Sequence, residues 1–177
     1  MQRVRNGFSF FLSLLTKKIC MLTVRKATAE DTERIAEVLM AKYSFPNVAE
    51  AGGIFAYERA YHHFRVAMDD ERMVGIISWR QQGTLAHGVA EVTRFAVLKD
   101  AIDPIQVKEL LFDTAIVEAE IHYENHGSKL RKVFSLIHSD NKRLQTFYAN
   151  KGLHQEAVLK DHFRLGQDEL VFSRFFA

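Results

Sequence analysis

The spacing of apolar positions changes several times along the chain, and each change marks the border of an expected element. Before residue 62 the spacing is mostly helical: Ile35, Val38 and Leu39 share one face of a helix that the capping pattern at Thr28–Asp31 opens. From residue 64 the spacing becomes that of strands, with a turn at Asp69–Arg72. The pattern predicts strands at Leu22–Lys26, Phe64–Met68, Met73–Trp79, Val89–Leu98, Val133–Ile137, Glu156–Leu159 and Glu169–Phe175.

Further helices are predicted between these strands. The longest covers Ile105–Tyr123 and begins after Asp103 and Pro104, which suit the N-cap and the first helical position. The others are Ala49–His62 and Asp140–Asn150. The order of strands and helices predicts an α/β domain with a mixed sheet. The long helix is expected to bury the face that carries Val107, Leu110, Leu111, Thr114, Val117 and Ile121.

The positive charge of the chain is concentrated at its start. Residues 1–20 carry Arg3, Arg5, Lys17 and Lys18 and no acidic residue, so the other 157 residues hold 20 basic and 22 acidic side chains. A broad basic surface for nucleic acid is therefore not expected.

The same leader has an apolar run at Phe8–Leu15, which gives it some likeness to a signal peptide. Lys17 and Lys18 stand where small residues would precede a cleavage site. We interpret residues 1–20 as an over-extended start or a disordered basic tail, with a weak interfacial anchor as the alternative. The domain is expected to cover residues 21–177, opening at Met21.

Composition excludes several other classes. The single cysteine, Cys20, excludes a disulfide framework and a cysteine-based zinc site. No apolar run reaches the length of a membrane-spanning helix, so stable membrane insertion is not expected. His122 and His126 are spaced to share a helix face, but no third ligand is paired with them, so no metal is expected.

Three segments carry a resemblance to a known family. Asn141-Lys-Arg-Leu-Gln-Thr-Phe-Tyr148-Ala-Asn-Lys-Gly152-Leu153 is the most specific, and Glu91–Val97 and the hairpin Arg65–Gly75 support it in the correct order and at the correct distances. The chain from Met21 onward resembles the GNAT N-acetyltransferase superfamily. The resemblance implies a single α/β domain, with a mixed, mostly antiparallel sheet flanked by helices.

Acyl transfer to an amine requires removal of a proton from the amine and a proton for the departing thiolate. By resemblance, Glu91 is the expected general base and Tyr148 the expected general acid. Each residue has a structural alternative: Glu91 as an exposed acid or an ion pair with Arg94, and Tyr148 as a core side chain. His138 ends the short strand beside the expected acyl cleft, which makes it a candidate auxiliary base or substrate contact.

The resemblance also implies how the acyl donor is held. Asn141 matches a residue that contacts the pantetheine arm, although it also suits the cap of its helix. The fourth strand is bulged in the family, and the backbone groups freed there bind the thioester arm. By position these are the backbone groups of Phe95 and Val97.

The sequence departs from the family where the pyrophosphate of coenzyme A is expected to bind. Family members place a glycine-rich loop there, whereas Ile102–Val107 contains no glycine. Pro104 removes an amide donor, and Asp103 brings a like charge towards the phosphate. Lys99 and Lys108 compensate in part in this interpretation, and Lys108 is an expected cofactor-binding residue.

Three functions fit this pattern. The first, which we expect, is a cytoplasmic N-acetyltransferase that moves an acetyl group from acetyl-CoA to a small-molecule or peptide amine. The second takes its acyl group from an acyl-carrier protein, which has no adenosine pyrophosphate to hold. The third is a non-catalytic ligand-binding module. The sequence leaves the acceptor, the acyl length and the oligomeric state open, with a homodimer as one option.

Overall fold

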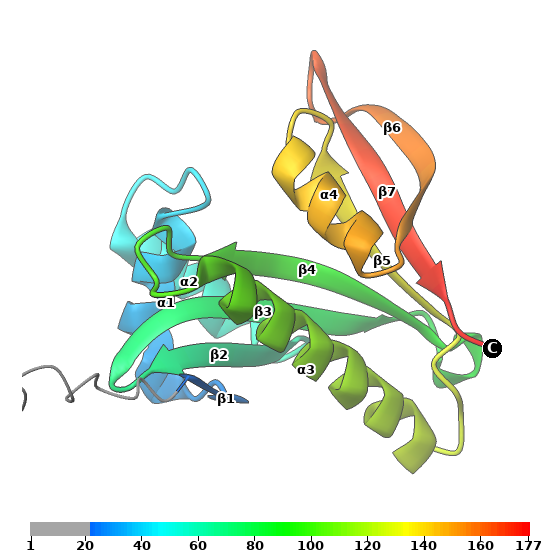
Figure 1. Cartoon of the computed structure of the whole chain (residues 1–177), viewed down its shortest axis with the longest axis horizontal. Helices are drawn as coiled ribbons and strands as arrows, with labels where there is room; N and C mark the ends of the chain where they lie inside the picture. Colours follow the sequence, from blue (N-terminus) through cyan, green and yellow to red (C-terminus); the bar gives the residue numbers. More distant parts are fainter. Residues whose placement is uncertain (1–21) are drawn as a thin grey trace, which may run out of the picture.

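The computed structural model describes residues 22–177, so the leader predicted at residues 1–20 lies outside the described part. In that part, strands form one sheet in the spatial order β1-β2-β3-β4-β5-β7-β6 (Figure 1). Neighbouring strands are antiparallel except β4 and β5, which are parallel. The strands are β1 (Leu22–Lys26), β2 (His63–Asp69), β3 (Arg72–Gln82), β4 (Val89–Val97), β5 (Lys132–His138), β6 (His154–Arg164) and β7 (Gln167–Phe175).

Helices cover both faces of the sheet (Figure 1). One core cluster joins the sheet to the long helix and the last helix, through Phe112 and Tyr148 among others. A second cluster joins the first two helices to the opposite face, through Ile35, Phe55 and Ile76 among others. The helices are α1 (Thr32–Met40), α2 (Val48–Glu58), α3 (Pro104–Asn125) and α4 (Lys142–Asn150), and short 3-10 helices lie at η1 (Ala29–Asp31) and η2 (Leu85–His87).

The predicted elements are all present, but some borders differ. Helix α2 ends at Glu58, so the prediction that it reaches His62 is wrong, because the chain turns there into β2. Strand β6 is longer than the predicted Glu156–Leu159. Most of its side chains are exposed, and its backbone pairs with β7, so its length leaves little trace in an apolar pattern.

The predicted buried face of α3 is wrong for three of its residues. Leu110, Val117 and Ile121 are exposed, whereas Ala115 and Ala119 lie in the core. Small side chains let a helix approach a sheet closely, so the alanine-bearing face packs inward. The buried residues of α3 are Val107, Leu111, Phe112, Ala115, Ile116, Ala119 and Tyr123.

The central feature of the sheet is the place where β4 and β5 separate. The two strands pair in parallel only from Val89 to Val92 on β4, opposite Lys132 to Ser135 on β5. Beyond that point each strand continues without the other as partner. The register of β3 against β4 shifts at Thr93, which is the bulge that the family resemblance implied.

Side chains fix the bulge in place. The Thr93 hydroxyl lies 2.8 Å from Ser78 Oγ and 3.1 Å from His62 Nδ1. The bulge and the separation of the strands together leave one side of β4 without a strand neighbour. Backbone groups on that side are available for other partners.

The entry to α1 contains a partly buried ion pair between Arg25 and Asp31. Asp31 accepts two hydrogen bonds from the guanidinium of Arg25, each 2.7 Å long, and one of 2.8 Å from the backbone N–H of Thr28. The hydrogen bonds from Arg25 contribute most to lowering the pKa of Asp31 from 3.8 to about 2. Its ionised form therefore favours the folded state.

Replacing Asp31 by asparagine is expected to lower the free energy of unfolding by about 1–2 kcal/mol at pH 7, less than the full shift because Arg25 is partly exposed. The carboxylate stabilises the fold above pH 3.8, and this contribution is lost as the pH falls through about 2. Urea denaturation at several pH values measures the difference. Asp100→Asn, in the exposed pair with Arg72, is the control and is expected to leave the urea midpoint nearly unchanged. A difference that persists below pH 2 would contradict this assignment.

Candidate functional site

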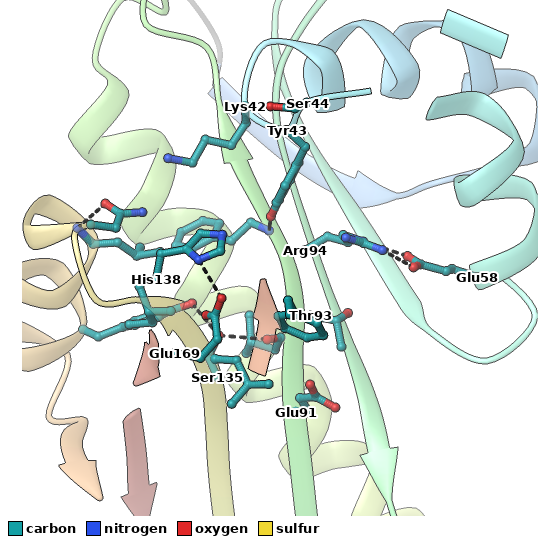
Figure 2. A pocket seen from close by; sticks show the side chains of 18 of the residues that line it. Lys42, Tyr43, Ser44, Glu58, Glu91, Thr93, Arg94, Ser135, His138 and Glu169 are labelled. Carbon is teal, nitrogen blue, oxygen red and sulfur yellow. Dashed lines mark hydrogen bonds and ion pairs between the residues drawn. The ribbon is translucent and has the colours of Figure 1, made fainter. Parts of the chain in front are cut away.

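A cavity of about 670 Å³ occupies the opening between β4 and β5. The separated halves of these two strands line it, together with the first turn of α4, the segment after α1 and the ends of β6 and β7. Figure 2 shows ionisable and hydroxyl side chains that converge on this space from several elements. Of the predicted site residues, Glu91, Phe95, Asn141 and Tyr148 line the cavity, as does the candidate His138.

Tyr148 lies at the inner wall of the cavity, two turns after the start of α4. Its side chain is fully buried, and its phenol donates a hydrogen bond of 3.2 Å to Ser135 Oγ. Ser135 in turn donates to the backbone carbonyl of Val92, at 2.9 Å. Burial raises the pKa of the Tyr148 phenol, so this group carries its proton throughout the physiological range. The arrangement suits a proton donor.

Asn141 is the N-cap of α4, and its Oδ1 accepts a hydrogen bond of 3.2 Å from the backbone N–H of Leu144. The capping role considered from the sequence is therefore present. Because Asn141 also lines the cavity, its position is compatible with both roles.

Glu91 is buried on β4, and its carboxylate has two partners. Its Oε2 accepts a hydrogen bond of 2.8 Å from Arg80 Nε and a further one from Gln82. The alternative that paired Glu91 with Arg94 is wrong, because Arg94 binds Glu58 instead. The partner of Glu91 comes from β3, where Arg80 lies directly opposite it in the strand register.

The backbone N–H of Phe95 points into the opening, where it donates a hydrogen bond of 3.0 Å to the Tyr43 phenol. The N–H of Leu98 instead donates to Val74 on β3, at 2.9 Å. Because successive amides of a strand alternate in direction, the N–H of Val97 faces the same side as that of Phe95. Sequence reasoning missed Tyr43, since nothing in a loop after a helix indicates that its side chain reaches another strand.

The first turn of α3 offers no free amide to a phosphate group. Asp103 Oδ1 accepts hydrogen bonds from the backbone N–H groups of Ile105, at 3.1 Å, and Gln106, at 3.0 Å. The N–H of Val107 donates to the backbone carbonyl of Asp103, and Pro104 has no N–H. The missing glycines are thus accompanied by an internal acidic cap at the place where helix amides would bind an anion.

Lys108 lies one turn further along α3, outside the cavity lining. Burial, followed by the positive charges of Lys42 and Arg143, lowers the pKa of Lys108. Among residues 22–177, no ion pair joins any of these three cations to a carboxylate. Their mutual repulsion is the electrostatic condition in which an anion binds favourably.

A pair that the sequence did not indicate lies at the end of β5. His138 Nδ1 is 2.6 Å from Oε1 of Glu169, which belongs to β7 and is only 2% exposed. Burial raises the pKa of Glu169, and the neighbouring His138 acts in the opposite direction. These residues are far apart in the sequence, and only the register of β5 against β7 brings them together.

Two other histidines, His63 and His122, pack against Trp79 outside the cavity lining. His63 stacks on the Trp79 ring with centroids 4.1 Å apart, and His122 meets the same ring edge-on at 5.4 Å. Within residues 22–177 no three His, Cys, Asp or Glu side chains are gathered in a way that holds a metal ion. In the same residues, no helix is both long and apolar enough to cross a membrane.

Comparison with known proteins identifies the fold of this chain through solved structures. No protein-family model matches the sequence, and no curated protein matches it. A structure from Desulfovibrio desulfuricans, assigned to the GNAT family of acetyltransferases, is similar with a TM-score of 0.69 and 20% identity, covering 89% of this chain and all of the other. The ribosomal-protein-S18-alanine N-acetyltransferase of Escherichia coli matches with a TM-score of 0.72 and 12% identity, over 89% of this chain and 95% of that one.

A spermidine N-acetyltransferase variant from Vibrio cholerae is similar at a TM-score of 0.69 and 15% identity, over 87% of this chain and 93% of the other. Residues 22–177 therefore have the fold of the GNAT acetyltransferases. The predicted fold class, an α/β domain with a mostly antiparallel sheet, is confirmed.

Proposed function

We propose that this protein is an N-acetyltransferase that moves an acetyl group from acetyl-CoA to an amine by direct attack. The observation that carries the proposal is the cavity at the β4–β5 opening, with a buried, protonated phenol at its wall. A thioester entering between the strands would meet amides of β4 that have no strand partner on one side and this phenol on the other. A CoA donor implies action in the cytoplasm.

In this proposal the donor arm lies along the open side of β4. The backbone groups of Phe95 and Val97 bind the thioester arm, and Asn141 contacts the pantetheine. The N–H of Phe95 now has Tyr43 as its partner, so donor binding exchanges one hydrogen bond for another at this amide. Exchange of equivalent hydrogen bonds has a small net free energy, so the Tyr43 contact does not exclude the donor.

The phosphate groups would be held by side chains instead of helix amides. Lys108 is the proposed contact, with Lys42 and Arg143 adding positive charge nearby. A cluster of unpaired cations attracts a diphosphate without the close backbone approach that glycine permits. This assignment explains how the phosphate groups would be bound in the absence of the glycine-rich loop.

Tyr148 is the proposed general acid, which protonates the departing thiolate. Its position next to Ser135 keeps the hydroxyl directed towards the place where the two strands separate. Glu91 remains the base predicted from the sequence. Its carboxylate lines the same cavity, but its charge already interacts with the guanidinium of Arg80.

The acceptor would be a small-molecule or peptide amine. The cavity wall contains Glu58, Glu91 and Glu169, which are partnered by Arg94, Arg80 and His138, so an amine would meet polar groups of both charge signs. Two of the similar structures have such acceptors in their names, a ribosomal-protein alanine and spermidine. These two amines are the first acceptors to test.

One observation favours a second donor. The acidic cap of Asp103 on α3 leaves no amide for a pyrophosphate, and an acyl-carrier protein presents a pantetheine arm without adenosine pyrophosphate. The two donors share the thioester and the arm, so they make the same demands on β4 and Tyr148. They differ in the need for Lys108.

Saturating acetyl-CoA is expected to raise the melting temperature of the full chain. A ligand at 100 times its Kd stabilises the folded state by about 2.7 kcal/mol, which corresponds to about 5–10 °C for a chain of this size. Differential scanning fluorimetry measures the shift. Lys108→Gln should reduce the shift with acetyl-CoA and leave the shift with S-acetyl-pantetheine unchanged, because the latter carries no phosphate.

Lys160→Gln is the matched control, since Lys160 is an exposed lysine on β6. It should behave like the unaltered protein with both ligands. A shift with S-acetyl-pantetheine but none with acetyl-CoA would move the assignment to a carrier-protein donor. No shift with either thioester would contradict the proposed function.

A further inference from the structure

His138 and Glu169 are in close contact at the cavity, with His138 Nδ1 2.6 Å from Glu169 Oε1. They are direct neighbours across the antiparallel β5–β7 pair, so both side chains project from the same face of the sheet. Val133 and Ile137 on β5, and Leu170 and Phe172 on β7, belong to the core beneath α3 and α4. Because side chains alternate along a strand, His138 and Glu169 lie on the opposite face.

The two partners differ in their access to the cavity. The Glu169 side chain is 3% exposed, while that of His138 is 47% exposed, and both residues line the cavity (Figure 2). Within residues 22–177, Glu169 Oε1 has no hydrogen-bond partner apart from its ion-pair contact with His138. A buried carboxylate oxygen whose polar neighbour is an imidazole nitrogen restricts the orientation of that ring. An arriving molecule can touch the imidazole but not the carboxylate.

We propose that His138, oriented by Glu169, accepts the proton that the acceptor ammonium must lose before it attacks the thioester. The inference rests on the proposed acyl transfer and assigns its base to β5 instead of to Glu91 on β4. His138 is the catalytic residue, since it touches the substrate. Glu169 is a positioning residue that holds the ring through Nδ1 and leaves Nε2 for the amine.

Proton affinity favours the imidazole over Glu91. In water an imidazole binds a proton about 100 times more tightly than a glutamate carboxylate does. The Glu91 carboxylate is occupied by hydrogen bonds from Arg80 and Gln82, whereas the His138 side chain is 47% exposed at the cavity. An amine that binds as ammonium loses its proton more readily to the stronger base.

Other charged groups surround the pair. Asp140, in the turn after β5, raises the pKa of Glu169, and His162 on β6 acts in the opposite direction. Lys42 and Arg164 line the same cavity from the segment after α1 and from the end of β6. The environment of His138 thus contains charges of both signs, with Glu169 in direct contact.

The protons and bonds balance in this scheme. The ammonium gives one proton to His138, and the neutral nitrogen attacks the thioester carbonyl. The C–N bond forms as the C–S bond breaks, and the thiolate takes a proton from Tyr148. The second proton leaves the nitrogen of the new amide and restores the tyrosine. His138 then releases its proton to solvent, so each turnover yields an amide, a free thiol and one proton.

The test measures thiol release from acetyl-CoA by the full chain, with spermidine or an alanine-terminated peptide as acceptor, over pH 5–9. His138→Gln is expected to lower kcat/KM by about 100-fold or more and to remove the fall in rate on the acidic side. Glu169→Gln should lower it by about 10-fold and move that fall to lower pH, because glutamine orients the ring without its charge. Added imidazole should partly restore His138→Ala.

His154→Gln and Glu109→Gln, at exposed positions, are the matched controls and should retain the original profile. A proton NMR spectrum of the unaltered chain should show a downfield signal from the Nδ1–H of His138, and Glu169→Gln should move this signal upfield. This measurement reports the contact of the His138 ring with Glu169 and does not depend on acyl transfer. Circular dichroism checks that each variant is folded.

Three results would overturn the inference. One is a wild-type rate and pH profile in folded His138→Gln. Another is loss of the acidic fall in Glu91→Gln while His138→Gln keeps it. The third is absence of thiol release from the unaltered chain with either amine together with no binding of acetyl-CoA, which would remove the proposed function as well.

Discussion

Replacement of Tyr148 by phenylalanine is expected to lower kcat by about 100-fold or more, with the Kd of acetyl-CoA changed by less than about twofold. The variant removes the one atom of Tyr148 that the proposed mechanism uses, the phenol oxygen that protonates the thiolate, and a positioned general acid contributes about 10²–10⁴ in rate. Steady-state kinetics with a saturating amine give kcat, and calorimetric titration gives the Kd.

The packing around Tyr148 is expected to remain in this variant, so a fall in kcat would report the loss of the proton donor and not a change of structure. The ring keeps its contacts with Phe95, Phe112 and Phe172, and Ser135 keeps its bond to the Val92 carbonyl. The lost hydrogen bond is expected to reduce the free energy of unfolding by only about 1 kcal/mol.

Tyr123→Phe is the matched control. Tyr123 is also fully buried and donates one hydrogen bond, of 2.5 Å, to the Val89 carbonyl, but it lies outside the cavity lining. Its variant should show a similar loss of stability and an unchanged kcat. Equal kcat values for the two variants would remove Tyr148 from the mechanism.

Gly88→Ala is expected to reduce the free energy of unfolding by about 3–4 kcal/mol, the largest stability effect that we predict. Gly88 precedes β4 with a φ of 61° and a ψ of 36°, a left-handed conformation that disfavours alanine by about 1–2 kcal/mol. A Cβ there would also overlap the backbone carbonyl oxygen of Lys129. The Gly88 carbonyl accepts hydrogen bonds from Arg131 and Lys132, so the overlap falls where β4 and β5 are joined.

Gly127→Ala separates the effect of the left-handed backbone conformation from the effect of the steric overlap. Gly127 has a similar φ of 68°, but a Cβ at this position meets nothing within 4 Å. We expect it to lose only the conformational part, about 1 kcal/mol. Urea denaturation of both variants measures the difference, and equal losses would show that the junction of β4 and β5 tolerates the added methyl group.

The element order followed from local patterns. Period-two and helical spacings located every strand and α-helix between residues 22 and 177, because each spacing reflects which side of one element is buried. The sequence also predicted the N-cap at Asp103, the proline after it and the glycine-free start of α3, since capping acts over a few neighbouring residues.

Contacts between side chains were much harder to predict from the sequence. Leu110 and Val117 are as apolar as the residues that α3 buries, and the choice between the faces depends on the fit of Ala115 and Ala119 against the sheet. The sequence offered an ion pair with Arg94 as one alternative for Glu91, whereas Arg80 reaches Glu91 through the β3–β4 register.

The sequence alone thus established the α/β class, the order of elements, the resemblance around Asn141–Tyr148 and the loss of the glycine-rich loop. The contacts of Tyr43 with Phe95 and of His138 with Glu169 became visible only in the folded chain. Local periodicity records how each segment divides its polar and apolar sides. Strand register and loop packing bring together residues distant in the chain, and no local pattern encodes those distances.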